Sequence, residues 1–179
     1  MIGVIFYGPP AAGKDTVTAA LTEICSGYRL FPRLKAGPGR TAGYRMTTPE
    51  AIDQLRRDGA VVWENSRYDS TYVVDRPHLE QMLSAGVVPV VHLGQLPGVD
   101  AVASAVPGAR WLRVYLWCPR DVAAQRIAGR ATGDDWARLQ VWDATEPLQA
   151  ADLTINTAEV APASAAAAIH ARVLAAPAG

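Results

Sequence analysis

The segment Gly8-Pro9-Pro10-Ala11-Ala12-Gly13-Lys14-Asp15-Thr16 stands between two stretches of different periodicity. Residues 2–7, directly before it, are mostly apolar and rich in β-branched and aromatic side chains, which predicts a buried strand. After it, apolar residues recur at helical spacing over residues 14–25. A loop of the form Gly-x-x-x-x-Gly-Lys between a strand and a helix is typical of a phosphate-binding P-loop.

The chemistry of this loop predicts a nucleotide ligand. Backbone N–H groups of small residues can turn inward around phosphate oxygens, and the helix N-terminus adds its positive end. We expect Lys14 to reach the β- and γ-phosphates of ATP, which makes it a candidate catalytic residue. The whole segment from Gly8 to Thr16 is therefore predicted to bind ATP.

Asp15 stands where most P-loops have a serine or threonine that ligates Mg²⁺. The apolar run that ends near His92 also lacks the acidic residue that steadies the metal in many P-loop enzymes. Because Mg²⁺ prefers oxygen ligands, the Asp15 carboxylate is a candidate metal ligand, directly or through water. An aspartate in the first turn also stabilises a helix start, so both interpretations of Asp15 remain open.

The rest of the chain alternates between apolar runs and helical patterns, which predicts an α/β fold of three layers around a parallel sheet. Further strands are expected at residues 60–63, 87–93, 111–118 and 153–155. Helices are expected at residues 76–85, 99–105, 120–127, 134–142 and 161–175. Two segments interrupt the alternation, 32–44 and 129–135, and both read as loops.

Composition limits the choice of partners. The chain has 179 residues, 17 basic against 17 acidic, so no protein-wide field favours a nucleic acid polymer or an anionic membrane. Its two cysteines, Cys25 and Cys118, lack metal-site spacing, and no apolar run has the length of a membrane span. We expect one cytoplasmic domain that binds anions locally; the oligomeric state is not indicated.

With this P-loop, the sequence resembles the guanylate-kinase-like branch of the nucleoside monophosphate kinases. That branch includes ribose 1,5-bisphosphate kinases, whose P-loops often read Gly-Lys-Asp-Ser where this chain has Gly-Lys-Asp-Thr. The resemblance covers residues 2–156. It implies a single P-loop kinase domain with a core at 1–31 and 76–179, an acceptor-binding insertion at about 32–75 and a lid at about 129–135. It further implies ATP and Mg²⁺ as cofactors and a small phosphorylated substrate.

The resemblance also assigns residues to the acceptor. Tyr44 and Tyr72 fall on the tyrosines with which the family grips the acceptor phosphate. Arg33 and Arg40 are the arginines upstream that match its phosphate-binding arginines in position. His92 is expected to line the pocket, because parallel sheets bind ligands at the carboxyl ends of their strands.

Two further arginines match the lid of the family. Arg130 falls on the first lid arginine and Arg138 on a later one, and both are candidate catalytic residues. Phosphoryl transfer between two phosphates brings several negative charges together, and a planar guanidinium can bind two oxygens while shielding their repulsion.

The sequence departs from the family at the positions that read guanine. Guanylate kinases place a glutamate before a tryptophan there, whereas this chain reads Trp63-Glu64, and Val74 replaces a serine. Trp63 is expected to form the floor of the acceptor site, with Glu64 facing it only if the strand is shifted by one residue. The departures imply a kinase for a nucleoside monophosphate or a ribose phosphate that is not strictly specific for GMP.

Two other functions remain open. A P-loop kinase acting on a small-molecule hydroxyl would need a carboxylate base, for which Asp69 and Asp75 are candidates. A guanylate-kinase-like interaction module without catalysis is the other alternative, and such modules typically lose the P-loop glycines and lysine that this chain keeps at Gly8, Gly13 and Lys14.

Overall fold

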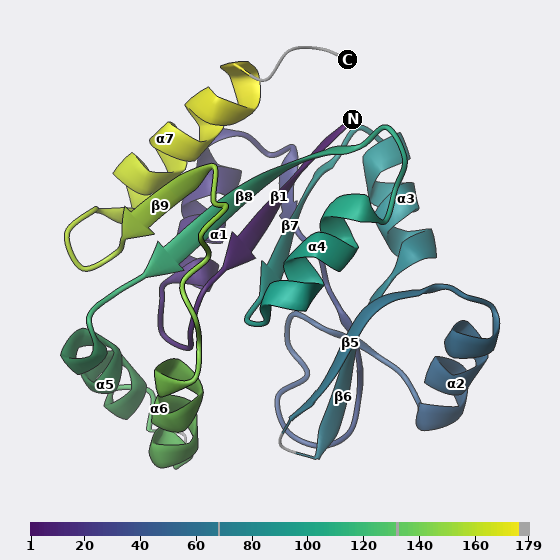
Figure 1. The fold of residues 1–179 in the computed structure, drawn as a ribbon, viewed down its shortest axis with the longest axis horizontal. Helices are drawn as coiled ribbons and strands as arrows, with labels where there is room; N and C mark the ends of the chain where they lie inside the picture. Colours follow the sequence, from purple (N-terminus) through teal and green to yellow (C-terminus); the bar gives the residue numbers. More distant parts are fainter. Residues whose placement is uncertain (68, 132, 176–179) are drawn as a thin grey trace.

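The computed structural model describes residues 1–67, 69–131 and 133–175. Its centre is a parallel sheet covered by helices on both faces (Figure 1). The sheet order is β2 (Tyr28–Leu30), β7 (Val88–Leu93), β1 (Ile2–Tyr7), β8 (Arg110–Trp117) and β9 (Leu153–Asn156). This arrangement confirms the predicted three-layer α/β fold.

Side chains of the central strand β1 alternate between the two faces of the sheet. Val4 and Phe6 pack with α1 (Lys14–Ile24) and α7 (Pro162–Ala175) in one apolar cluster. Ile5 and Tyr7 pack with α3 (Arg76–Ser84) and α4 (Leu96–Ser104) in another. Burial on both faces explains why the parallel strands are continuous apolar runs in the sequence.

A second, smaller sheet follows β2 in the chain. Its order is β4 (Arg45–Met46), β3 (Leu34–Ala36), β6 (Ser70–Asp75) and β5 (Val61–Arg67), and α2 (Pro49–Arg57) packs on one face of it. The expected strand at 60–63 belongs here and runs antiparallel to β6, so its assignment to the parallel sheet was wrong. The 32–44 loop is likewise corrected, because it contains β3.

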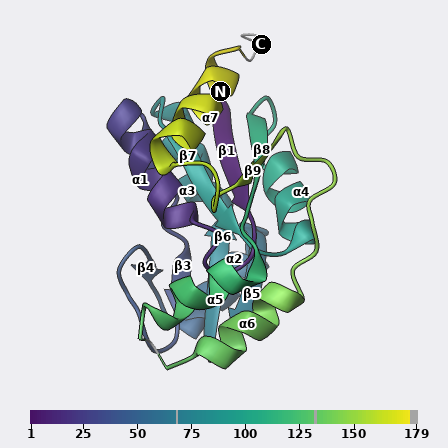
Figure 2. The same cartoon turned by 90° about the vertical axis from the view of Figure 1, so that its left-hand side faces the viewer.

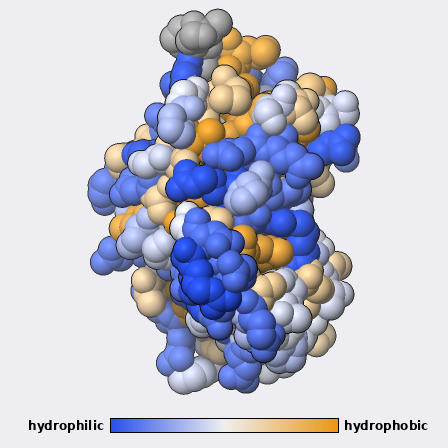
Figure 3. Space-filling model, turned by 90° about the vertical axis from the view of Figure 1, so that its right-hand side faces the viewer, coloured by the Kyte–Doolittle hydropathy of each residue, from blue (hydrophilic) through white to orange (hydrophobic). Residues whose placement is uncertain are grey.

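The outer surface around α2 is polar. Figure 3 shows this side of the molecule, with hydrophilic residues gathered over its middle and apolar residues in small patches between them. In α2 only Ile52 is buried, and it contacts Ala36 and Val73 of the small sheet. The other face of the small sheet is therefore the one available to a ligand.

The helices α5 (Arg120–Ala128) and α6 (Asp135–Asp143) pack on each other at the carboxyl end of the parallel strands. Ala123 and Ile127 of α5 form a small cluster with Ala11 of the P-loop. Figures 1 and 2 show that α5, α6 and the small sheet all lie at this end of the main sheet. The expected lid at 129–135 joins the two helices, and its residue 132 lies outside the described residues.

The remaining differences from the sequence-based prediction are local. α4 begins at Leu96 rather than at residue 99, with a proline in its first turn. The strands β2, β4 and β6 and the helix α2 were not predicted. Within the described residues, none of the helices combines the length and apolarity required to span a membrane.

Candidate active site

The backbone of the P-loop takes a shape that depends on its glycines. Gly8 has a φ of +154°, and a Cβ there would lie 2.0 Å from the carbonyl oxygen of Leu116. Gly13 has a φ of +87° directly before α1, and Ala11 also has a positive φ of 61°. These conformations favour glycine. They turn the loop around the N-terminus of α1, as a P-loop requires.

Lys14 lies at the centre of this loop. Its Nζ donates hydrogen bonds to the carbonyl oxygens of Gly8 at 2.6 Å and Pro9 at 2.9 Å. Burial lowers the pKa of Lys14 from 10.5 to about 8, with the positive charges of Arg33 and Arg130 acting in the same direction. The neighbouring Asp15 opposes this shift. An anion bound at the loop would stabilise the charged form of Lys14.

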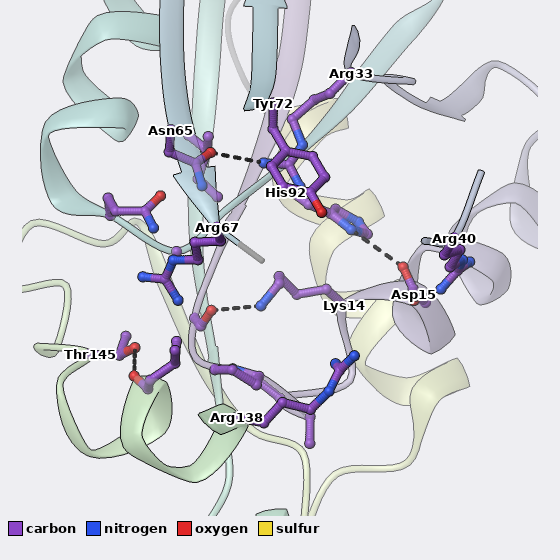
Figure 4. A pocket seen from close by; sticks show the side chains of 18 of the residues that line it. Lys14, Asp15, Arg33, Arg40, Asn65, Arg67, Tyr72, His92, Arg138 and Thr145 are labelled. Atoms are coloured by element: carbon purple, nitrogen blue, oxygen red, sulfur yellow. Dashed lines mark hydrogen bonds and ion pairs between the residues drawn. The ribbon is translucent and has the colours of Figure 1, made fainter. Parts of the chain in front are cut away.

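The P-loop opens into a pocket of about 540 Å³ at the carboxyl end of the parallel sheet. Figure 4 shows Lys14, Arg67 and Arg138 around this one cavity. The described lining includes seven cationic side chains and two carboxylates, those of Asp15 and Asp134. The cations are Lys14, Arg33, Lys35, Arg40, Arg67, Arg130 and Arg138. This excess of positive charge fits a ligand with several phosphate groups.

Most of the residues predicted from the sequence line this pocket together. They are the cations Lys14, Arg33, Arg40, Arg130 and Arg138, together with Gly8, Pro10, Ala11, Ala12, Gly13, Asp15, Tyr44, Tyr72 and His92. Pro9 and Thr16 of the P-loop do not line it. Pro9 contributes its carbonyl to Lys14 instead, and the Thr16 side chain is exposed on α1.

An arginine and two tyrosines form the wall contributed by the small sheet. The rings of Tyr44 and Tyr72 lie 5.3 Å apart, and the Arg33 guanidinium lies 5.8 and 5.2 Å from their centres. Arg33 also donates to Oδ1 of Asn65 at 3.5 Å. Contacts with two aromatic faces hold a guanidinium in place without neutralising it. Arg33 therefore keeps its charge for a ligand.

Trp63 and Glu64 do not line the pocket, which corrects both predictions. Trp63 packs into the apolar cluster beneath α4, where Gly98 makes room for its ring. Glu64 lies on the opposite face of β5 and forms an ion pair with Arg56 of α2 at 2.9 Å. Because side chains of a strand alternate, Trp63, Asn65 and Arg67 share one face of β5. The helix α4 covers Trp63, whereas Asn65 and Arg67 line the pocket.

Several lining residues were missed by the sequence analysis. Those from the small sheet and its loop are Lys35, Pro38, Gly39, Asn65 and Arg67, and those from elsewhere are Leu93, Gly94, Gln95, Asp134, Val141 and Thr145. Extending the strand at 60–63 with a period of two would have found Asn65 and Arg67. Lys35 gave no such signal, because β3 has only three residues.

His92 lies between the P-loop helix and the sheet. Its ring stacks on Phe6, and its Nε2 is 2.8 Å from Oγ1 of Thr18, which donates to the carbonyl of Lys14. Burial, followed by the charges of Lys14 and Arg33, holds the pKa of His92 well below 6.5. His92 is therefore neutral near pH 7 and adds no charge to the pocket.

Comparison with known proteins supports the fold through solved structures of low sequence identity. No protein-family model matches the chain, and no curated protein matches it. Among solved structures it resembles guanylate kinase from Anaplasma phagocytophilum, with a TM-score of 0.69 and 16% identity over 97% of this chain and 85% of that one. It also resembles a sugar kinase from Janibacter sp. HTCC2649, with a TM-score of 0.58 and 17% identity over 99% and 96%.

The chain has a guanylate-kinase-like P-loop kinase fold. In this structure α5 packs directly on the P-loop, whereas Arg130, between α5 and α6, and Arg138, on α6, line the pocket. Arg138 forms an ion pair with Asp134 at 2.7 Å on the same helix end. Arg126 does not line the pocket; it donates to the Ala11 carbonyl and to Thr157, which ties the P-loop to the segment after β9.

The described side chains do not form a complete Mg²⁺ site by themselves. A bound Mg²⁺ would also need oxygen atoms from the phosphates of a ligand. Among the described residues there is no group of three or more histidine, cysteine or acidic side chains that could hold a metal. Asp15 lies at the P-loop, exposed, with His92 Nδ1 at 3.5 Å and Arg40 at 3.9 Å. Mg²⁺ commonly combines one carboxylate with substrate phosphates and waters, and Asp15 fits that role.

The two aspartates considered as catalytic bases lie outside the pocket. Asp75 is buried, forms an ion pair with Arg45 and accepts a hydrogen bond from the backbone of His78 at the start of α3. Asp69 lies in the turn before β6 with a positive φ of 56°. Asp75 thus stabilises a helix start and Asp69 forms a turn, and neither faces a ligand.

Proposed function

We propose that the protein is an ATP-dependent phosphotransferase that phosphorylates the phosphate group of a small metabolite, either a nucleoside monophosphate or a sugar phosphate. One observation carries this proposal: the P-loop with Lys14 shares a single pocket with a second cationic wall built from Arg33, Tyr44 and Tyr72. A P-loop alone would serve many nucleotide-binding proteins. A second anion-binding wall facing it suits an enzyme that joins two phosphates.

The proposed chemistry depends on position and charge. An acceptor phosphate is already anionic and needs no general base, so orientation and electrostatic stabilisation suffice. Lys14 would hold the phosphates of ATP, and Arg130 and Arg138 would shield the charge that builds up during transfer. Mg²⁺, when bound with ATP, supplies further positive charge, with Asp15 as the candidate protein ligand.

The alternative of a hydroxyl acceptor has less support. The described pocket lining offers Asp15 and Asp134 as carboxylates, and Asp134 is paired with Arg138. With Asp69 and Asp75 outside the pocket, neither aspartate considered as the base can reach a substrate hydroxyl. The interaction module is disfavoured by the complete P-loop.

The test is a survey of acceptors with purified protein, ATP and Mg²⁺, measured as acceptor-dependent release of ADP. Nucleoside monophosphates, their deoxy forms and ribose phosphates form one set, and the corresponding nucleosides and free sugars form the matched set. We expect turnover with at least one phosphorylated compound and none with its dephosphorylated partner. Turnover confined to the dephosphorylated set would contradict the proposal.

A further inference from the structure

Lys35 is a buried lysine on the pocket face of the small sheet. It is 2% exposed, yet it lines the pocket. On β3 its side chain lies opposite Tyr72 of β6, whereas Ala36 packs on the other face against Ile52 of α2. The alternation of this short strand therefore aims one lysine at the ligand-binding side.

Within the part of the chain that the structure describes, the contacts of the Lys35 ammonium are with neutral groups. Its Nζ donates to the carbonyl oxygens of Pro38 at 2.5 Å and Arg40 at 2.8 Å. It also lies 5.6 Å from the ring centres of both Tyr44 and Tyr72. None of the ion pairs among the described residues involves Lys35. An ammonium has three donors, so the contacts with described residues leave one for a ligand in the pocket.

A buried charge without a counter-ion is unfavourable, because dipoles and aromatic faces replace only part of its hydration. The same two rings also face the Arg33 guanidinium, so two cations share them. This pair of positive charges would be balanced by an anion that enters between the small sheet and the P-loop. The third donor of Lys35 and the guanidinium of Arg33 offer such an anion directed hydrogen bonds.

We propose that Lys35 is a substrate-binding residue that makes this wall of the pocket specific for a phosphate dianion. Its ammonium donates to a phosphate oxygen that Arg33 also holds, beside the hydroxyl groups of Tyr44 and Tyr72. The assignment of that phosphate to the acceptor rests on the proposed function. The binding of phosphate at Lys35 does not, and it can be measured without any nucleotide.

A purely structural role would be to hold the loop formed by residues 37–40. That role does not require a charge, because neutral donors also bind carbonyl oxygens. The Pro38 carbonyl indeed accepts a second hydrogen bond from Oγ of Ser70 at 3.1 Å. The two roles differ in what they predict: anion binding depends on the charge of Lys35, whereas the loop depends on its hydrogen bonds.

The first experiment measures binding of inorganic phosphate as a rise in melting temperature. A Lys14→Ala background weakens binding at the P-loop. Lys35→Gln, which keeps hydrogen-bond donors and removes the charge, is then compared with Arg57→Gln, which removes an exposed cation of α2 outside the pocket. We expect the Lys35→Gln change to weaken the apparent phosphate affinity by about tenfold or more, and the Arg57→Gln change to leave it within about twofold. The proposal would be overturned if phosphate raised the melting temperatures of the two double variants equally. It would also be overturned if phosphate did not raise the melting temperature of the Lys14→Ala variant.

The second experiment uses the acceptor found in the survey. Lys35→Met is expected to raise the KM for the acceptor by about tenfold while the KM for ATP stays within about twofold, and Lys35→Arg to restore part of the acceptor affinity. An unchanged acceptor KM would overturn the role of Lys35 while leaving the proposed function intact. Phosphate binding that depends on Lys35 in a protein without kinase activity would instead overturn the proposed function and keep the site.

Discussion

At the scale of single residues, Lys14 connects the shape of the P-loop with its chemistry. Its ammonium is held by two carbonyls of its own loop and is surrounded by other cations. No hydrogen bond from its Nζ reaches a distant part of the described fold. Removing the side chain is therefore expected to affect ligand binding far more than folding.

We predict that Lys14→Ala abolishes phosphoryl transfer and leaves the fold intact. The substitution removes the charge that would face the phosphates of ATP, while the glycines and carbonyls that shape the loop remain. Turnover with the best acceptor and the circular dichroism spectrum are measured side by side. A folded variant with the turnover number of the wild type would show that the P-loop assignment is wrong.

The lowered pKa of Lys14 predicts a pH dependence of nucleotide binding. Between about 8 and 10.5 the folded, ligand-free protein has lost a proton that the unfolded chain keeps, so stability rises with pH in that window. Bound phosphates favour the charged form, so binding of ATP must take up that proton and ATP affinity falls as pH rises above 8.

Isothermal titration of ATP in two buffers of different ionisation enthalpy measures this proton uptake. We expect uptake in the wild type above pH 8 and less of it in Lys14→Met, which has no proton to gain. Identical proton uptake in the two proteins would assign the titration to another group.

At the scale of elements, a strand could be predicted from the sequence when both of its faces are buried. The strands β1, β7 and β8 are buried on both faces, so their apolar runs are visible in the sequence. The strands β3 and β6 have one face toward the ligand and mix polar with apolar residues. The helix α2 buries only Ile52, so its sequence contains few apolar residues to mark it, although Thr48 caps its start and Pro49 follows.

The residues of the candidate site divide in a similar way, into those with a local sequence pattern and those placed by contacts that are distant in sequence. The residues of the P-loop could be predicted because their pattern lies within one short segment and is typical of one backbone conformation. Glu64 could not be placed, because a strand reverses its faces with a shift of one residue. Trp63 could not be placed, because the helix α4 that covers it is distant in sequence. The pairing of Asn65 with Tyr72 across β5 and β6 sets that register, and it depends on contacts that are distant in sequence. The position of Lys35 depends on strand pairing in the same small sheet, so it could not be predicted either.

The register of β5 predicts that GMP is a poor acceptor. Glu64 faces Arg56 of α2, and Val74 is fully buried in an apolar cluster. Neither can pair with the N–H groups of guanine, and an unpaired polar group costs about 1–3 kcal/mol. We expect kcat/KM for GMP to be roughly tenfold or more below that for the best phosphorylated acceptor, measured by steady-state kinetics.

Glu64→Gln is the matched control for this prediction. Because its carboxylate contacts α2, the substitution is expected to leave the kinetics with GMP and with the best acceptor unchanged within about twofold. GMP as the clear best substrate of the wild type, lost on Glu64→Gln, would show that Glu64 reads the base after all.

At the scale of the whole molecule, three parts of the chain meet at the carboxyl end of the parallel sheet. The P-loop contributes Lys14, the small sheet contributes Arg33, Lys35 and Tyr72, and the segment around α6 contributes Arg138. The formal net charge of the chain is zero, yet the pocket gathers cations from all three parts. We infer that this convergence serves to hold two phosphate-bearing ligands against each other.

The most direct test of that claim is the phosphorus NMR spectrum of the product formed from ATP and the best acceptor. Transfer to a phosphate creates a phosphoanhydride, whose two phosphorus nuclei split each other's signals. With an acceptor other than AMP, we predict coupled signals distinct from those of ATP and ADP in the wild-type reaction, and the absence of these new signals with Lys14→Ala. A new, uncoupled phosphomonoester signal would show transfer to a hydroxyl group and contradict the proposed phosphate acceptor.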